Sequence, residues 1–301
     1  MGGNNLRPTP TTVVDVMKSL TIIGMGTPSI AMEKCSMLFQ PDFISNKIAI
    51  VAIDVVRCTS TLLACFAAGV RSVTVTVKGN EERGTTLSQS QLVSEKLGAE
   101  LVIGGELKGL PIPGGVISNS PAEAAVCKTL AGKHLHFESS NFGKTFSAIA
   151  KMTYDFIQIG GDAQIFIAST SNTVSITDSL KAGGFNKIYF VCGGFYNGIT
   201  LEDEFVAGEI IHGLNIDFIE LDDEARMMSI LYKSCNTYEE RLAMISTNSV
   251  TKLLEKFDKQ GDIETVLNGK DIPNDVWHKM TTIVPIVTWV NSIPVIEQQK
   301  K

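Results

Sequence analysis

The sequence predicts an α/β fold, in which a mainly parallel or mixed sheet lies between helices and a helix-rich C-terminal part follows. Between about residues 47 and 193, short apolar runs alternate with amphipathic stretches, which is the spacing of strand–helix–strand units in a parallel sheet. Several amphipathic stretches end at glycine, a common residue just beyond a helix C-terminus. After about residue 200, helical patterns dominate the remaining chain.

The expected strands are short runs rich in apolar and β-branched residues, and the first of them is apolar enough to be buried on both faces. They cover residues 47–54, 73–78, 101–105, 133–138, 164–169 and 187–193. The expected helices in this region cover residues 61–69, 85–98, 121–132 and 172–183. Residues 144–161 fit either one helix or a helix followed by a strand, because periodicity does not separate the two in short apolar runs. Four helical patterns follow between residues 201 and 267, and the apolar run 282–287 could return a strand to the sheet.

The domain organisation is interpreted as a flexible N-terminal lead-in, residues 1–20, followed by a single catalytic α/β unit, residues 21–301. The first ten residues carry one arginine and no apolar run, so we expect no signal peptide. A boundary near residue 200, where the sequence pattern changes, is the alternative. No Pro-, Gly- or Ser-rich linker marks such a boundary.

Composition and charge favour a cytoplasmic globular protein. Hydrophobic residues make up 44% of the chain and charged residues 19%, which provides ample apolar material for a core. The net charge of −6 argues against a nucleic-acid partner, since nucleic-acid-binding proteins usually present a basic face. No segment has the ~18 consecutive apolar residues of a membrane helix, and the six cysteines form no CxxC pair. We therefore expect no membrane association, no structural zinc and reduced thiols.

Polar side chains follow several of the expected strands, at the point where each strand ends. Asp54 and Arg57 follow the first strand. The others are Glu106 and Lys108, Asn119 and Ser120, Asn141 and Lys144, and Glu202 and Asp203. Ligands of parallel α/β sheets bind beyond the carboxyl ends of the strands, so one shared cleft would explain all of these residues.

The residue types at these strand ends indicate a site for an anion and a hard metal ion. Arg57 can hold a phosphate or carboxylate by two parallel hydrogen bonds. Thr59 and Ser60 lie where a helix begins, beside free backbone N–H groups and the positive end of the helix dipole. Carboxylate oxygens are the ligands that Mg²⁺ prefers, with water completing its coordination shell. The candidate ligands are Asp54, Glu202 and Asp203.

Each of these features also has a purely structural explanation. Thr59 and Ser60 could cap the helix that follows them. Glu202 and Asp203 could complement the dipole of a helix that they begin. Arg57 could pair with the acid at the end of its own strand.

Five short motifs, taken in order, carry a resemblance to a known family. They are DVVRCTST, GGELKG, SNSP, ESSNFGK and CGGFYNGITLEDEFVAG, and their order and spacing extend over residues 48 to about 290. With these motifs the chain resembles the 2-phosphosulfolactate phosphatase family. The resemblance implies an α/β enzyme that hydrolyses the phosphate ester of 2-phospho-3-sulfolactate with Mg²⁺, in a pathway of the coenzyme M biosynthesis type.

The resemblance also implies roles for residues of this chain. Asp54, Arg57, Glu106 and Asn141 are the expected catalytic residues, and either water or Asp54 could attack phosphorus. The expected substrate-binding residues are Thr59, Ser60, Lys108, Asn119, Ser120, Phe142 and Lys144, and the expected metal ligands are Asp54, Glu202 and Asp203. The expected partner is a small anionic phosphorylated substrate, and a homodimer is a common oligomeric state for such enzymes.

The chain departs from the family pattern at positions expected to hold the second anionic group of the substrate. Leu107 stands where the family often has Arg, with Lys108 one place on, and Ser118 replaces a Gly. Phe142 replaces a bare backbone position, so we expect it to line the pocket and narrow it. These departures leave two alternatives open. The same metal-dependent scaffold could catalyse a lyase or cyclisation reaction in specialised metabolism, or the chain could be a non-catalytic sensor of an anionic metabolite.

Overall fold

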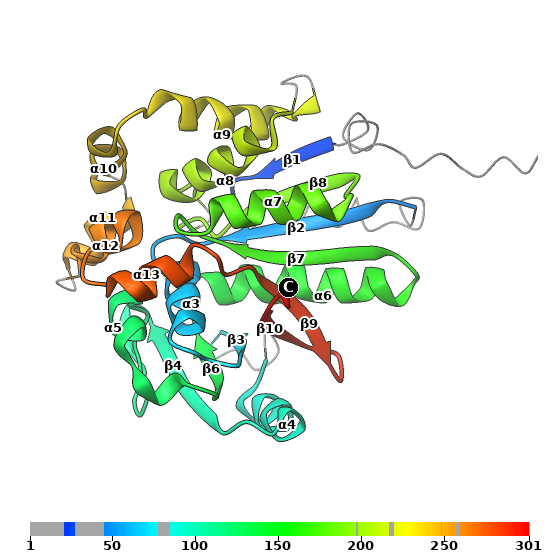
Figure 1. Ribbon diagram of the computed structural model, residues 1–301, viewed down its shortest axis with the longest axis vertical. Helices are drawn as coiled ribbons and strands as arrows, with labels where there is room; N and C mark the ends of the chain where they lie inside the picture. Colours follow the sequence, from blue (N-terminus) through cyan, green and yellow to red (C-terminus); the bar gives the residue numbers. More distant parts are fainter. Residues whose placement is uncertain are drawn as a thin grey trace, which may run out of the picture.

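The structure is an α/β fold with a mixed sheet between helices, as the sequence predicts (Figure 1). This computed structural model describes residues 21–27, 45–77, 85–196, 198–216, 220–247, 249–256 and 259–300. The expected flexible lead-in, residues 1–20, lies outside these described residues. Among the described helices, none is both long enough and apolar enough to cross a membrane.

The sheet consists of two parallel blocks joined by an antiparallel hairpin. Across the described residues its order is β1 (Thr21–Met25), β8 (Lys187–Cys192), β2 (Lys47–Ile53), β7 (Asp162–Ala168), β9 (Pro285–Val290), β10 (Ile293–Gln298), β3 (Ser72–Thr76), β6 (His134–Glu138), β4 (Leu101–Leu107) and β5 (Leu110–Pro111). Strands β1, β8, β2 and β7 pair in parallel, as do β3, β6 and β4. The β9–β10 hairpin pairs antiparallel with both blocks (Figure 1). The second block therefore runs opposite to the first.

The hairpin meets each block at a single residue pair. Within the described residues, Ile286 of β9 pairs with Phe166 of β7, and Ile296 of β10 pairs with Val73 of β3. In a flat sheet, blocks of opposite direction would point their carboxyl ends at opposite edges. Here Asn141, which follows β6, donates a hydrogen bond to Asp54, which follows β2. The two blocks must therefore be twisted or bent relative to each other, which brings their carboxyl ends to one cleft.

Strand β2 is buried on both faces and divides the core into two clusters. Ile48 and Ile50 belong to the larger cluster, and the alternate residues Val51 and Ile53 belong to the second. This alternation follows from the two-residue period of side chains along a strand. It explains why β2 appears in the sequence as one continuous apolar run.

Helices cover both faces of the sheet. In the described residues they are α3 (Cys58–Ala67), α4 (Leu87–Leu97), α5 (Pro121–Val126), α6 (Phe142–Gln158), α7 (Thr173–Gly183), α8 (Leu201–Leu214), α9 (Asp223–Ser234), α10 (Tyr238–Ser246), α11 (Ser249–Glu255), α12 (Asp262–Asn268) and α13 (Asn274–Met280). The larger cluster takes its helical residues from α3, α5, α6 and α13, and the second takes them mainly from α7, α8 and α9. A small third cluster gathers residues of α10, α11 and α12 against the partly buried Val56 and Phe195, so these helices lie beside the loops that follow β2 and β8.

Local signals set several of the helix ends. Thr86 and Gln89 form a capping box at the start of α4, and Gly98 ends that helix in the left-handed conformation, with φ 59°, as the sequence predicts for residues 85–98. The ambiguous stretch 144–161 is a helix, α6, directly followed by the strand β7. The helix expected over 121–132 is shorter, because Cys127 adopts an extended conformation and a 3-10 turn follows at Lys128–Leu130.

Three strands were not predicted, and the C-terminal part holds more helices than expected. The apolar run at 282–287 forms β9 a few residues later, as expected, but β1, β5 and β10 have no counterpart in the predicted set. Six helices follow residue 200 within the described residues, where four were predicted. Three of the six, α11, α12 and α13, are only seven residues long, and short helices carry little periodic signal.

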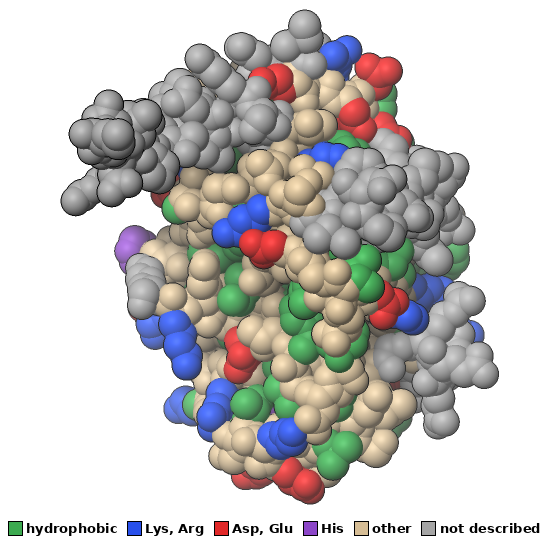
Figure 2. Space-filling view, turned by 90° about the vertical axis from the view of Figure 1, so that its right-hand side faces the viewer, with side chains coloured by type: hydrophobic (Ala, Val, Ile, Leu, Met, Phe, Trp, Pro, Cys, Tyr) green, Lys and Arg blue, Asp and Glu red, His purple; other side chains and the backbone are tan. Residues whose placement is uncertain are grey.

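The surface mixes charges of both signs. On the face drawn in Figure 2, Lys and Arg side chains and Asp and Glu side chains lie in small interspersed groups among uncharged ones. Although the net charge of the chain is −6, the described part of this face therefore carries no single acidic patch.

Candidate active site

A cleft of about 1460 Å³ opens where the carboxyl ends of the two blocks meet. Its lining includes residues that follow different strands. Those predicted from the sequence are Asp54, Arg57, Glu106, Lys108, Asn119, Asn141, Lys144, Glu202 and Asp203. One cleft thus brings together residues that are up to about half the chain apart in sequence.

Asp54 lies directly after β2, and its carboxylate is held on both oxygens. Oδ1 accepts a hydrogen bond from the backbone N–H of Cys58 at 3.2 Å, and Oδ2 accepts one from Nδ2 of Asn141 at 3.0 Å. Gly193 allows this packing, because a Cβ atom there would lie 2.7 Å from Oδ2 of Asp54. Burial raises the pKa of Asp54 to about 6, and the charge of Glu106 adds to the rise, while the two hydrogen bonds oppose it.

Asn141 links the ends of β6 and β8 at this carboxylate. Besides Asp54, its Nδ2 lies 2.6 Å from the carbonyl oxygen of Gly194 and 3.3 Å from that of Gly193. Asn141 directly precedes α6, whose second residue, Gly143, packs against β3. A Cβ atom at Gly143 would lie 2.5 Å from the carbonyl oxygen of Thr76. This close approach fixes the start of α6, and with it the position of Asn141.

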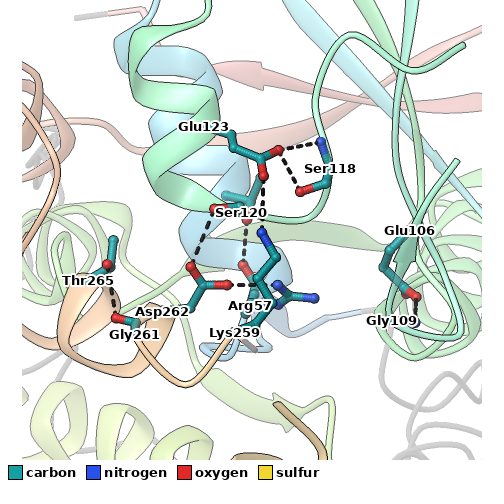
Figure 3. Close-up of polar contacts among 11 residues, drawn as sticks. Arg57, Glu106, Gly109, Ser118, Ser120, Glu123, Lys259, Gly261, Asp262 and Thr265 are labelled. Carbon is teal, nitrogen blue, oxygen red and sulfur yellow. Dashed lines mark hydrogen bonds and ion pairs between the residues drawn. The ribbon is translucent and has the colours of Figure 1, made fainter. Parts of the chain in front are cut away.

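Arg57 forms a buried ion pair with Asp262, the first residue of α12. Nη1 of Arg57 lies 2.7 Å from Oδ2 of Asp262 (Figure 3), and the two side chains are 6% and 9% exposed. Oγ of Ser120 donates to the other oxygen of Asp262 at 3.4 Å. Arg57 therefore donates its side-chain hydrogen bond to Asp262 and not to Asp54. The structural explanation that Arg57 pairs with the acid at the end of its own strand does not hold. Sequence reasoning missed Asp262, which follows Gly261 in a polar stretch without a distinctive motif.

Glu106 closes the turn after β4. Its Oε2 accepts from the backbone N–H of Gly109 at 2.6 Å, and its Oε1 accepts from the backbone N–H of Ser140 at 2.6 Å. Lys108 occupies this turn with φ 53° and its side chain is exposed. The backbone N–H of Lys108 donates to Oγ of Ser140 at 2.9 Å. Glu106 thus ties the end of β4 to the residues that lead into α6.

Asp203, in the first turn of α8, holds together the loops that follow β2 and β8. Its Oδ1 accepts from the backbone N–H of Val55 at 2.8 Å. Its Oδ2 accepts from Oγ1 of Thr200 at 2.7 Å and from the backbone N–H of Gly194 at 3.2 Å. Burial raises the pKa of Asp203 well above its ordinary value, and the charges of Glu202 and then Asp54 raise it further.

The donor chemistry of these acids fits Mg²⁺ in part. Asp54, Glu202 and Asp203 are buried oxygen donors on the cleft wall, close enough for their charges to interact. Within the part of the chain that the structure describes, however, no group of three or more Asp, Glu, His or Cys side chains is gathered as a metal site. Three hydrogen bonds already occupy Asp203. The acids fit an ion that takes one or two carboxylates and completes its shell with water and substrate oxygens, as Mg²⁺ commonly does.

Thr59 and Ser60 do not line the cleft. Oγ1 of Thr59 donates to the backbone oxygen of Asp54 at 2.9 Å, and Oγ of Ser60 donates to that of Val55 at 2.8 Å and contacts Ser169. Asp54 also accepts from the N–H groups of Cys58 and Thr59. Asp54 therefore accepts from the first backbone N–H groups of α3. The hydroxyls of Thr59 and Ser60 do not cap this helix, as their structural explanation supposed, but bond backbone oxygens of the loop before it.

The prediction that Phe142 lines and narrows the pocket is wrong. Phe142 is fully buried in the larger core cluster, and its ring stacks on Phe146 with centroids 5.7 Å apart. As the first residue of α6, it points toward the core, while Asn141 and Lys144 line the cleft.

The remaining predicted residues lie at the cleft or next to it. Lys144 is exposed on the cleft wall, and Asn119 is buried there with no hydrogen-bond partner for its Oδ1. Ser120 is buried beside Asp262 rather than on the cleft wall.

Comparison with known proteins decides the family. The model of the 2-phosphosulpholactate phosphatase family matches residues 37–276. This chain belongs to that family. The resemblance inferred from the five motifs is therefore confirmed.

Curated relatives carry the same family name. One from Clostridium perfringens (strain SM101 / Type A), named a probable 2-phosphosulfolactate phosphatase, is 27% identical over 262 residues, which cover 78% of this chain and 98% of the relative. Relatives with the same name from Carboxydothermus hydrogenoformans and from Synechococcus sp. (strain JA-3-3Ab) are 29% and 26% identical. The matched regions cover 67% and 61% of this chain, and 76% and 69% of those relatives.

Proposed function

We propose that this chain is a Mg²⁺-dependent phosphatase that hydrolyses a small anionic phosphomonoester. The observation that carries the proposal is the meeting of Asp54, Asn141 and Arg57 in one cleft of a chain that belongs to a phosphatase family. Relatives are named probable 2-phosphosulfolactate phosphatases, so 2-phospho-3-sulfolactate is the first substrate to test.

Arg57 is suited to bind the phosphoryl group. Asp262 accepts a hydrogen bond from Nη1 and fixes the guanidinium. Arg57 also borders the cleft, so its other N–H groups are available to phosphoryl oxygens. A donor that is already oriented needs no reorganisation as charge develops in the transition state. Lys108 and Lys144, exposed on the cleft wall, would bind the second anionic group of the substrate.

Asp54 is suited to exchange a proton, or to attack phosphorus, near neutral pH. In the metal-free protein its raised pKa of about 6 lies close to the pH at which an acid or base is most effective in catalysis, and Mg²⁺ bound at the same carboxylate would lower it. Asn141 fixes one carboxylate oxygen. Two mechanisms are consistent with this position: water attacks phosphorus with Asp54 as base, or Asp54 attacks directly. Acid quenching of a reaction with labelled substrate distinguishes them, because only direct attack leaves a phosphorylated enzyme.

The acids Asp54, Glu202 and Asp203 would hold Mg²⁺. Their mutual repulsion, visible in the raised pKa of Asp203, is what a divalent cation would relieve. When bound, the ion would neutralise phosphoryl oxygens and acidify a water molecule.

The decisive experiment measures free phosphate released by the full-length protein from a set of small phosphomonoesters, with Mg²⁺ and with a chelator. Release that requires Mg²⁺ supports the proposal, and equal release with the chelator rejects the metal. Tight binding by calorimetry without any phosphate release would reject the phosphatase and favour a sensor of anionic metabolites. A cytoplasmic location and a homodimer stay predictions.

A further inference from the structure

The cleft continues well beyond the acids, along helix α6. Its lining recurs on successive turns of that helix, from Asn141 past Thr145 and Ala148 to Tyr154. Thirteen residues of α-helix correspond to about 20 Å. A compact phosphoester bound at Asp54 would leave most of this length unfilled.

The far end of the cleft is aromatic. It lies between α6 and the β9–β10 hairpin, where Tyr154, Trp289 and Ile293 line it. The rings of Tyr154 and Trp289 are 6.2 Å apart and tilted by 39°. The indole N–H of Trp289 is buried and has no hydrogen-bond partner. An indole N–H can only donate, so this group would recognise an acceptor atom.

Two buried hydroxyls of the cleft lining also lack partners. Thr85 and Thr145 are each 2% exposed and line the cleft, and neither Oγ1 has a hydrogen-bond partner. Buried polar atoms in native structures are nearly always paired with protein, water or ligand. Thr145 lies one helical turn after Asn141, so it stands between the acids and the aromatic end.

We propose that this far end binds the organic part of an elongated phosphomonoester, namely a flat ring that carries oxygen acceptors. The inference rests on the proposed function for the phosphate end of the cleft. Aromatic side chains stack on flat rings, and the unpartnered indole N–H would bond an oxygen of the ring. The hydroxyl of Thr145, nearer to the acids, would bond an oxygen of the part of the ligand that joins the ring to the phosphate. Lys151 and Asp155, which line the same end, form an ion pair at 2.6 Å and offset each other's charge. An uncharged ring therefore suits this end better than a second anion.

The first test compares substrates of increasing length. Phosphate release is measured with 2-phospho-3-sulfolactate, uridine 5′-monophosphate, riboflavin 5′-phosphate and an unbranched alkyl phosphate without a ring. We expect kcat/KM to be highest for the phosphoesters whose rings carry carbonyl oxygens. Equal or better turnover of the alkyl phosphate, or exclusive use of the compact substrate, would overturn the inference and leave the phosphatase proposal intact. Release from none of them would reject the phosphatase instead.

The second test uses variants at the far end. Trp289→Ala should raise KM for the ring-bearing substrates by about tenfold or more and leave the compact substrate unchanged. Thr145→Val keeps the shape and removes an unpartnered hydroxyl, so it should raise KM for the same substrates without lowering the melting temperature. It serves as the second probe if Trp289→Ala fails to fold. Equal effects on compact and elongated substrates, or no effect on either, would contradict the inference.

The third test measures binding without turnover. The chain has two tryptophans, so Trp277→Phe leaves Trp289 as the single fluorescent indole. Riboflavin, the ring without the phosphate, should quench this fluorescence saturably, and the matched Trp289→Phe protein should show only unsaturable quenching. Saturable quenching of equal strength in both proteins, or in neither, would show that Trp289 does not meet the ring. This readout does not depend on phosphatase activity.

Discussion

Replacing Asp262 by Asn removes the charge that faces the Arg57 guanidinium and keeps the shape of the side chain. The two groups are 2.7 Å apart, and their side chains are 6% and 9% exposed. Removing one partner of a buried ion pair typically costs about 3–5 kcal/mol of unfolding free energy, because it leaves an uncompensated charge. Asn still offers an acceptor and Arg57 borders the cleft, so we expect the loss of one charge-assisted hydrogen bond, ~2–3 kcal/mol.

The same substitution should also lower turnover. Without Asp262 the guanidinium loses the contact that orients it toward the cleft, so we expect kcat/KM to fall about 10- to 100-fold, or roughly 1.4–2.8 kcal/mol. Urea unfolding at pH 7, followed by circular dichroism, measures the first effect. Phosphate release at several substrate concentrations measures the second.

Lys259→Gln is the matched control for Asp262→Asn. Lys259 pairs with Glu123 at 3.3 Å in the same region (Figure 3), but these side chains are 34% and 43% exposed. Exposed pairs typically contribute less than about 1 kcal/mol. If Asp262→Asn costs no more stability than Lys259→Gln, the reasoning from the buried ion pair is refuted.

Four further predictions concern the site and its surroundings. Arg57→Lys should cost about 2–4 kcal/mol of transition-state stabilisation, because an ammonium cannot reproduce two parallel hydrogen bonds; a lower melting temperature with unchanged turnover would contradict this. Glu202→Gln should weaken Mg²⁺ binding about tenfold in calorimetry with the fold intact, and unchanged affinity would remove Glu202 from the metal site. The fold raises the pKa of Asp54 from 3.8 to about 6, so the folded protein binds the proton of this carboxyl group more tightly than the unfolded chain does. The resulting contribution to the free energy of unfolding declines as pH rises from about 4 to 6. Asp54→Asn should then abolish turnover. At pH 7 its free energy of unfolding in urea should exceed that of the wild type by up to ~3 kcal/mol, reduced by the contribution of one lost hydrogen bond. If this gain in stability persists at pH 4, the raised pKa of Asp54 is not its cause. Burial lowers the pKa of both His134 and His136 from 6.5 to about 4, so stability should fall as pH drops from about 6.5 toward 4, by about 3 kcal/mol per histidine; a His134→Gln/His136→Gln protein with the same pH slope would exclude them as the cause.

The parts of the fold that the sequence predicts are those that depend on local signals. Residues 47–53 form strand β2 because every residue from Ile48 to Ile53 is apolar, which is what a strand buried on both faces requires. Residues 85–98 contain helix α4, whose capping box and terminal glycine are both visible in the sequence. The β9–β10 hairpin was only half predicted, since its position between β7 and β3 depends on contacts far apart in sequence.

The site was predictable in its residue types and less so in their geometry. Asp54 and Asn141 could be recognised because they follow strands whose carboxyl ends face a ligand. Phe142 was misplaced by a single position: one step along a helix turns a side chain by about 100°, enough to move the ring from the cleft to the core. Asp262 could not be predicted, because nothing local distinguishes an acid that will meet Arg57 from one that will face water.

The position of the β9–β10 hairpin also affects how the chain can fold during synthesis. The strands on either side of it, β7 and β3, are complete long before residues 285–298 are made. Until then, each parallel block ends in an unpaired edge, and exposed edges can pair with other chains. Vectorial synthesis should therefore produce two half-sheets that the last segment joins. Shortening the chain before β9 would leave both edges open and favour aggregation.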